Sequence, residues 1–153
     1  MKIAEILSPD RVTQGRTFTS KKKALEELSQ LLARGVPGLM PADILTSLAN
    51  REKLGSTGLG HGVAIPHGRM PGVTQSVGAF MRLTHPLDYD AHDGQPVDLI
   101  FGLLVPHGAT ETHLKHLAAI AEMFSDNAFC EQARGAADEG ALFQMLSAYT
   151  PGG

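Results

Sequence analysis

His67 is the residue whose setting most strongly favours chemistry. It lies between Pro66 and Gly68, directly after the short apolar segment 63–65. Proline fixes the backbone before the imidazole, and glycine lets the backbone approach a ligand closely. An imidazole at the exit of a strand would be presented at a sheet edge, where α/β proteins bind ligands. The local pattern leaves two interpretations open, a reactive histidine and an ordinary surface histidine in a turn.

Two further histidines, His113 and His116, are three residues apart in a segment with helical spacing. That spacing places both near one face of a helix. With His67 they could form a metal site, but the spacing matches no strict zinc signature and a metal usually needs further ligands. The simpler alternative is that His116 is an exposed or packing histidine. The remaining histidines that we expect in loops, and to which we assign no role, are His85, His92 and His107.

A glycine-rich segment, 55–62, precedes His67 and holds four glycines in eight residues. Regular structure there would be costly. One interpretation is a wall of free backbone N–H groups near an anion, and the other is a tight connection. The segment lacks the lysine of a P-loop and does not complete a dinucleotide fingerprint, so it predicts no nucleotide site.

Arg51 lies at the end of a predicted helix, just before this segment. An arginine can hold a phosphate through two parallel hydrogen bonds. A cation near the C-terminus of a helix is also favourable without any ligand. The residue alone therefore does not decide between a binding role and a structural one.

The elements that must position these residues alternate between helices and strands. Apolar residues at helical spacing and capping signals predict five helices. The first helix begins after Ser20 and ends near Gly35, and the second runs from Pro41 to about Lys53. The third runs from Thr110 or Thr112 to about Phe124. The last two cover about 127–134 and 138–148. Strands are predicted at 63–65, 77–83 and 97–105, the last buried on both faces. This order predicts one α/β domain over 1–153, with a mixed β-sheet flanked by helices on both faces.

Composition narrows the function classes. The formal net charge is −3, Trp is absent and aromatic residues make up 5%, so we expect no nucleic-acid partner. The longest apolar segment, 97–106, is far too short to span a bilayer, so we expect no direct membrane insertion. One cysteine, Cys130, excludes an internal disulfide, and no signal peptide follows Met1. These features predict a cytoplasmic protein.

Taken together, the residues around His67 resemble the signature of a known family. Residues 51–60, REKLGSTGLG, and 62–68, GVAIPHG, are similar to the signature of the fructose/mannitol/nitrogen class of phosphotransferase IIA domains. Residues 20–26 are similar to the start of the first long helix in the nitrogen-type branch. Further similarity lies in 95–101, 104–106 and 112–114, so that the resemblance covers about 6–146.

The resemblance implies a role for each candidate residue. His67 would carry a phosphoryl group, His113 would flank its ring and donate to the phosphoryl oxygens, and Arg51 would add positive charge. Imidazole suits this role because it is partly neutral near pH 7 and then offers a lone pair. Backbone N–H groups of the glycine loop would also donate to the phosphoryl oxygens. The reaction on this protein would need no metal ion and no cofactor. The loop residues meant are Gly55, Ser56, Thr57, Gly58 and Gly68.

Two departures from the family pattern occur near the site. His61 stands where relatives often carry Asn, which could alter the local charge. The loop after Arg69 is short and contains Pro71-Gly72 in place of an acidic stretch. Neither change touches the expected nucleophile.

The partners implied by the resemblance are proteins. The donor would be an HPr-type phosphocarrier, charged from phosphoenolpyruvate by enzyme I. Nitrogen-type relatives act mainly as regulators, and their targets include potassium-transport and sensor-kinase proteins. The alternative readings are a IIA subunit of a fructose- or mannitol-type sugar permease, a histidine-ligated metal enzyme, and an interaction module with a vestigial site.

Overall fold

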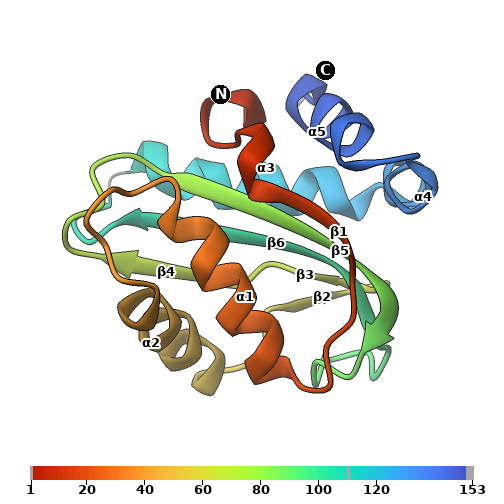
Figure 1. The fold of residues 1–153 in the computed structure, drawn as a ribbon, viewed down its shortest axis with the longest axis horizontal. Coiled ribbons are helices and arrows are strands. Elements are labelled where there is room, and N and C mark those ends of the chain that lie inside the picture. Colours follow the sequence, from red (N-terminus) through yellow and green to blue (C-terminus); the bar gives the residue numbers. More distant parts are fainter. Residues whose placement is uncertain (1, 110, 151–153) are drawn as a thin grey trace.

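The fold is built on one mixed β-sheet (Figure 1). The structure, a computed structural model, describes residues 2–109 and 111–150, without the side chain of Thr112. In these residues the sheet has six strands in the order β1-β5-β6-β3-β2, and β4 also pairs with β6. The strands are β1 (Val12–Arg16), β2 (Gly58–Gly60), β3 (Val63–Ala64), β4 (His67–Met70), β5 (Val77–Leu87) and β6 (Val97–Pro106). Strand β6 is antiparallel to β5 and parallel to β3 and β4.

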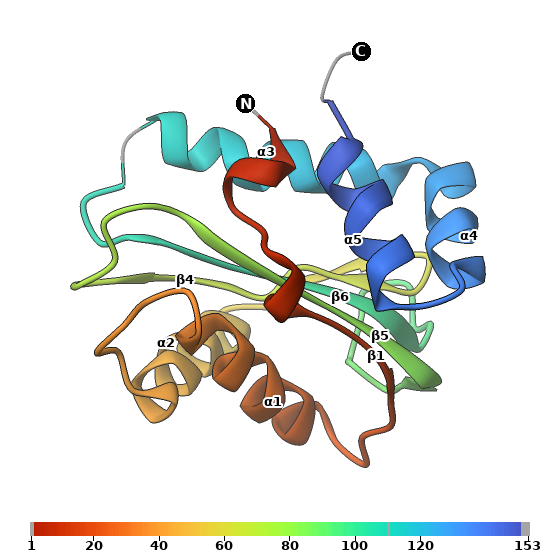
Figure 2. The ribbon, with the colours of Figure 1, turned by 45° about the horizontal axis from the view of Figure 1, so that its top comes forward.

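Helices cover both faces of this sheet (Figure 2). Two helices pack on one face, and three helices lie with the N-terminal segment on the other. The helices are α1 (Lys21–Ala33), α2 (Pro41–Lys53), α3 (Glu111–Ser125), α4 (Asn127–Gly135) and α5 (Glu139–Ala148), with short 3₁₀ turns at Ile3–Glu5 and Pro9–Arg11. The predicted α/β fold with a mixed, doubly covered sheet is confirmed. No helix in the described part of the chain is long and apolar enough to cross a membrane.

The helix ends follow local chemistry. The Ser20 hydroxyl accepts the N–H of Lys23 at 3.2 Å, which caps α1 as predicted. Pro41 occupies the first position of α2, where its missing N–H costs nothing. Asp126 and Asp138 cap α4 and α5 through their carboxylates. Of the two residues predicted to begin α3, Thr112 lies inside the helix, which begins at Glu111, and Thr110 lies outside the described residues.

Strand β6 is the centre of the core, as its apolar sequence predicted. Its residues from Val97 to Val105, apart from Asp98, are buried. Gly102 faces α1 so closely that a Cβ there would lie 2.7 Å from a methyl of Leu28. The absence of a side chain at Gly102 therefore allows α1 to pack directly on β6.

The strand before Pro66 ends as predicted, but the structure has a further strand directly after it that was not predicted. Strand β3 ends at Ala64, and a new strand, β4, begins at His67 and continues along the same edge of β6. Proline cannot donate to the ladder, so the pairing is interrupted between the two strands. The interruption leaves the carbonyl of Ile65 available to a side chain.

One strand boundary and two further strands differ from the predictions. Strand β5 continues to Leu87, four residues beyond the predicted end. Strand β1 was not predicted, because only two of its five residues are buried and its pairing partner β5 is distant in sequence. The glycine-rich segment contains a short strand, β2, that pairs with β3.

Candidate functional site

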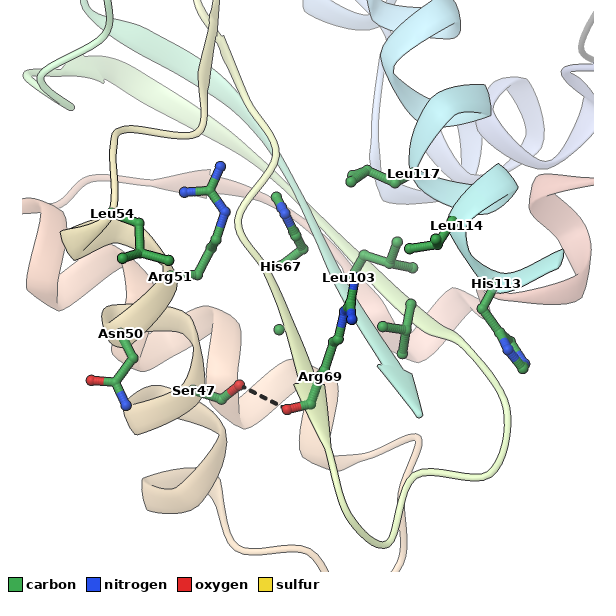
Figure 3. A pocket seen from close by; sticks show the side chains of 12 residues that line it. Ser47, Asn50, Arg51, Leu54, His67, Arg69, Leu103, His113, Leu114 and Leu117 are labelled. Atoms are coloured by element: carbon green, nitrogen blue, oxygen red, sulfur yellow. Dashed lines mark hydrogen bonds between the residues drawn. The ribbon is translucent and has the colours of Figure 1, made fainter. Parts of the chain in front are cut away.

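A pocket of about 330 Å³ opens between the end of α2, strand β4 and the start of α3 (Figure 3). His67, Arg51 and His113 all lie on its wall, although they are far apart in sequence. The sheet supplies its floor through β4 and β6. The full set of lining residues is Ser47, Asn50, Arg51, Leu54, His67, Gly68, Arg69, Leu103, Val105, His113, Leu114 and Leu117.

The imidazole of His67 is held in one orientation by the backbone. Its Nδ1 lies 2.8 Å from the carbonyl oxygen of Ile65, which can only accept a hydrogen bond. Nδ1 must therefore carry a proton, and in the neutral ring Nε2 then holds the free lone pair. The interrupted strand makes this possible, because the β3–β4 break leaves the Ile65 carbonyl free for the ring.

The surroundings of His67 favour the neutral ring. Burial lowers the pKa of His67 below its usual 6.5, and the positive charges of Arg51 and Arg69 lower the pKa further. The hydrogen bond to Ile65 and the charge of Glu52 act in the opposite direction without reversing the shift. At neutral pH, Nε2 of His67 accordingly offers an available lone pair.

Arg51 reaches the pocket from the last turn of α2. Its Nη1 donates to the carbonyl oxygen of Gly55 at 2.8 Å, which fixes one end of the guanidinium. Figure 3 shows the guanidinium on the same side of the pocket as the ring of His67. The remaining N–H groups of Arg51 can hold an oxyanion in the pocket.

His113 lies on the same pocket wall but is not aimed at His67. It comes from the first turn of α3, and Figure 3 shows its ring turned away from the His67 imidazole. The ring makes an edge contact with His116, with centroids 6.2 Å apart. A change of side-chain rotamer would be needed to bring His113 to a group bound on His67.

The glycine loop contacts Arg51 through the Gly55 carbonyl but does not form part of the pocket wall. None of Gly55, Ser56, Thr57 and Gly58 lines the pocket. The N–H of Thr57 donates to Glu52, and the N–H of Gly58 donates to Ser56 Oγ at 3.1 Å. These two N–H groups are engaged inside the loop, so a direct hold on an anion through them stays a prediction.

Gly68 is the one member of the predicted phosphate loop that lines the pocket. A Cβ at this position would collide with the hydroxyl of Ser47 on α2. Ser47 Oγ in turn donates to the carbonyl of Arg69 at 3.4 Å, as drawn in Figure 3. Glycine is thus what lets β4 and α2 approach each other beside His67.

A neutral imidazole beside a guanidinium, in a pocket open to solvent, has the chemistry of a phosphoryl acceptor. The comparisons with known proteins agree with that chemistry. Residues 5–149 match the family model described as "Phosphoenolpyruvate-dependent sugar phosphotransferase system, EIIA 2". The chain belongs to this family.

Individual EIIA 2 relatives include several nitrogen regulatory proteins. The chain is 42% identical to a nitrogen regulatory protein of Pseudomonas aeruginosa, over 95% of each chain. It is 40% identical to one of Bradyrhizobium diazoefficiens, over 96% of this chain and 95% of that one. The solved structure of nitrogen regulatory protein IIA-Ntr from Neisseria meningitidis is 45% identical with a TM-score of 0.89, over 94% of this chain and 98% of that one. The IIA mannitol structure from Escherichia coli, at 18% identity and a TM-score of 0.75, shares the fold.

Several pocket residues were not predicted from the sequence. Leu54 and Leu114 stand on opposite sides of the opening and are 84% and 45% exposed. Arg69 adds a second guanidinium from β4. In the sequence these residues look like ordinary helix and strand residues, and only the packing of α2 against β4 and of α3 against β6 brings them to one place. A leucine directly after the predicted end of a helix was the signal available for Leu54.

His116 is separated from the pocket, since it is buried and does not line it. Its Nδ1 lies 2.7 Å from Ser76 Oγ. Within residues 2–109 and 111–150, no group of three or more His, Cys, Asp or Glu side chains is arranged to hold a metal ion. The alternative of a metal enzyme built on His67, His113 and His116 therefore gains no support from the geometry.

The buried His116 predicts a pH dependence of stability. Burial, followed by the charge of His113, lowers the pKa of His116 below its usual 6.5. The unfolded chain then binds more protons than the folded chain below that value, so the free energy of unfolding falls as pH drops through about 6.5. We expect His116→Gln to lose less stability than wild type between about pH 7.5 and about pH 5.5, measured by urea unfolding. His85→Gln, at an exposed position, should keep the wild-type pH dependence, and equal slopes for all three proteins would contradict the assignment.

Proposed function

We propose that this chain is a phosphoryl carrier of a phosphoenolpyruvate-dependent relay, which receives the group on Nε2 of His67. The observation that carries the proposal is the 2.8 Å contact between His67 Nδ1 and the Ile65 carbonyl. It fixes the tautomer and leaves Nε2 as the nucleophilic atom. The membership in the EIIA 2 family supports the same role.

The transfer step balances without a cofactor. The Nε2 lone pair attacks phosphorus in line, the P–N bond of the donor phosphohistidine breaks, and its electron pair returns to the donor ring. The His67 ring gains positive character as the new P–N bond forms. Its Nδ1–H stays in place, and the Ile65 carbonyl stabilises it by a charge-assisted hydrogen bond.

The phosphoryl oxygens would be held by cations of the pocket. Arg51 supplies N–H donors that are already fixed by its bond to Gly55. His113 would donate to the same oxygens after turning its ring into the pocket. Gly68 would let its backbone lie close to the phosphoryl group. The loop of Gly55, Ser56, Thr57 and Gly58 would act indirectly, through the bond from Arg51 to the Gly55 carbonyl.

The proposed donor is an HPr-type phosphocarrier that docks over His67. The exposed Leu54 and Leu114 flank the pocket opening and offer an apolar contact on either side of the reacting atom. Such a small contact suits a transient interface, because a relay partner must leave after transfer.

The proposed physiological role is regulatory and cytoplasmic. The identity to nitrogen regulatory proteins is 40–42% over nearly full length, against 29% to a fructose-specific EIIABC component of Bacillus subtilis. These figures favour the nitrogen-type branch over a subunit of a sugar permease. Phosphorylation adds about two negative charges beside the docking surface, which would switch binding to protein targets such as potassium-transport or sensor-kinase proteins.

Incubation with phosphoenolpyruvate, enzyme I and an HPr-type donor tests the proposal. Intact-mass measurement should show a single phosphoryl adduct that is lost in acid, as a phosphoramidate requires. The donor must be shown to phosphorylate a known nitrogen-type IIA protein in parallel. Absence of an adduct with that competent donor would overturn the proposal and favour an interaction module with a vestigial site.

A further inference from the structure

Glu52 is a nearly buried carboxylate next to Arg51, and its oxygens are engaged by Thr57 and Lys21. Its side chain is 6% exposed. It accepts the backbone N–H of Thr57 at 3.1 Å and also the hydroxyl of Thr57. The ammonium of Lys21 on α1 lies 2.9 Å from Oε1. A carboxylate so shielded from water stays charged only when it is paired and hydrogen-bonded. Thr57 and Lys21 supply these partners for Glu52.

The cluster around Glu52 closes through Tyr89. The Tyr89 hydroxyl lies 3.3 Å from Thr57 Oγ1, and because Thr57 donates to Glu52, Tyr89 is the donor in this contact. The Lys21 ammonium lies 4.3 Å from the centre of the Tyr89 ring. Burial, and then the charge of Glu52, raises the pKa of Tyr89, so its hydroxyl keeps its proton. The cluster thereby joins Lys21 of α1 and Tyr89 to Glu52 and Thr57.

Arg51 and Glu52 hold the same short loop from two sides. Arg51 Nη1 donates to the carbonyl of Gly55, and two residues later Thr57 is held by Glu52. Gly55 has a φ of +148°, a conformation that residues with a side chain rarely adopt, so glycine is what allows the chain to turn here. The Gly55 N–H donates to the Glu52 carbonyl at 3.1 Å, and the hold at Thr57 restrains the chain on the other side of the Gly55 carbonyl, which in turn accepts from the Arg51 guanidinium.

Building on the proposed phosphoryl transfer, we infer that Glu52 is a positioning residue for the reaction. It fixes Thr57, Thr57 fixes the Gly55 carbonyl, and that carbonyl aims Arg51 at the group carried by His67. The glycine loop would thus act by orienting the Arg51 guanidinium. Gly55 allows the backbone to turn between the contact with Arg51 and the contact of Thr57 with Glu52.

The position of Glu52 gives a signature that a purely structural role would lack. Arg51 and Arg69 lower the pKa of His67 and Glu52 raises it, while His113 stands on the opposite wall of the pocket. Removal of the Glu52 charge therefore lowers the pKa of His67 further. The acid limb of the uptake rate, which reports protonation of His67, should move to lower pH.

The experiment is a time course of phosphoryl uptake from the HPr-type donor, with Glu52→Gln beside wild type. We expect a rate at saturating donor that is lower by about tenfold or more, because small misplacement of a positioned group is costly. The KM for the donor and the final adduct of one phosphoryl group should stay close to wild type, and the acid limb should move down. The matched control is Glu26→Gln, which removes a glutamate that pairs with Lys23 on the surface of α1, and it should behave as wild type.

Thr57 supplies a second pair of variants in case Glu52→Gln is poorly folded. Thr57→Val removes the hydroxyl that links Glu52 to Tyr89 and should slow uptake, whereas Thr57→Ser restores the hydroxyl and should recover most of the rate. A wild-type rate for Glu52→Gln or Thr57→Val, or a change in donor KM alone, would overturn the inference and leave the carrier proposal intact. Failure of wild type to accept the group would instead overturn the carrier proposal itself.

Discussion

Replacement of His67 by glutamine is expected to abolish phosphoryl uptake completely. Glutamine retains a polar side chain that can donate to the Ile65 carbonyl, but it has no nitrogen lone pair to attack phosphorus. His67 is only half-buried, so the fold should survive the change. Intact-mass measurement after incubation with the complete relay should show no adduct, which means a loss of at least about a thousandfold in rate.

His85→Gln is the matched control for that variant, because it removes an exposed imidazole from β5 outside the pocket. It should accept one phosphoryl group at the wild-type rate. Nitrogen-15 NMR of the phosphorylated wild type should place phosphorus on Nε2 of His67, since Nδ1 is engaged by Ile65. An adduct on His67→Gln would show that another residue accepts the group, and phosphorus on Nδ1 of the wild type would show that the tautomer fixed by Ile65 does not select the acceptor atom.

The parts of the fold that follow from local sequence were predictable. The apolar spacing after Ser20, the proline at the start of α2 and the continuous apolar run of β6 each reflect a local preference, and each element was found. Strand β4 was not predictable in the same way. It exists because His67 to Met70 pair with Leu103 to Pro106, more than thirty residues later in the chain. No local feature of His-Gly-Arg-Met predicts a strand.

The candidate site shows the same division between local and distant causes. The motif around His67, together with Arg51, was visible in the sequence, and the structure brings both to one pocket. The glycines of the loop were visible too, but their number does not reveal that Thr57 donates its N–H to Glu52. The sequence therefore left open whether the loop contacts an anion or makes a tight connection, and the structure adds that Glu52 holds the loop at Thr57. Only the placement of α2 against the loop distinguishes these two uses of the same residues.

Arg51 offers the second large effect. Arg51→Met retains much of the half-buried stem and removes both the charge and the hydrogen bond to Gly55. We expect phosphoryl uptake to slow by about a hundredfold at saturating donor, the usual consequence of losing one preorganised donor to a developing oxyanion. Arg51→Lys should recover only part of the rate, because an ammonium cannot bind the Gly55 carbonyl and a phosphoryl oxygen in the planar geometry of a guanidinium. Lys53→Met, an exposed cation two residues later on α2, is the control and should leave the rate unchanged.

The pH dependence separates Arg51 from its neighbour Glu52. Arg51 lowers the pKa of His67, so its removal raises that pKa and moves the acid limb of the uptake rate to higher pH. Glu52→Gln moves the same limb to lower pH, although both variants slow the reaction. Adjacent residues on one helix turn should thus give rate losses of the same sign and pH shifts of opposite sign. Shifts in the same direction would mean that the two variants act through a common loss of loop structure, and that His67 does not sense the two charges separately.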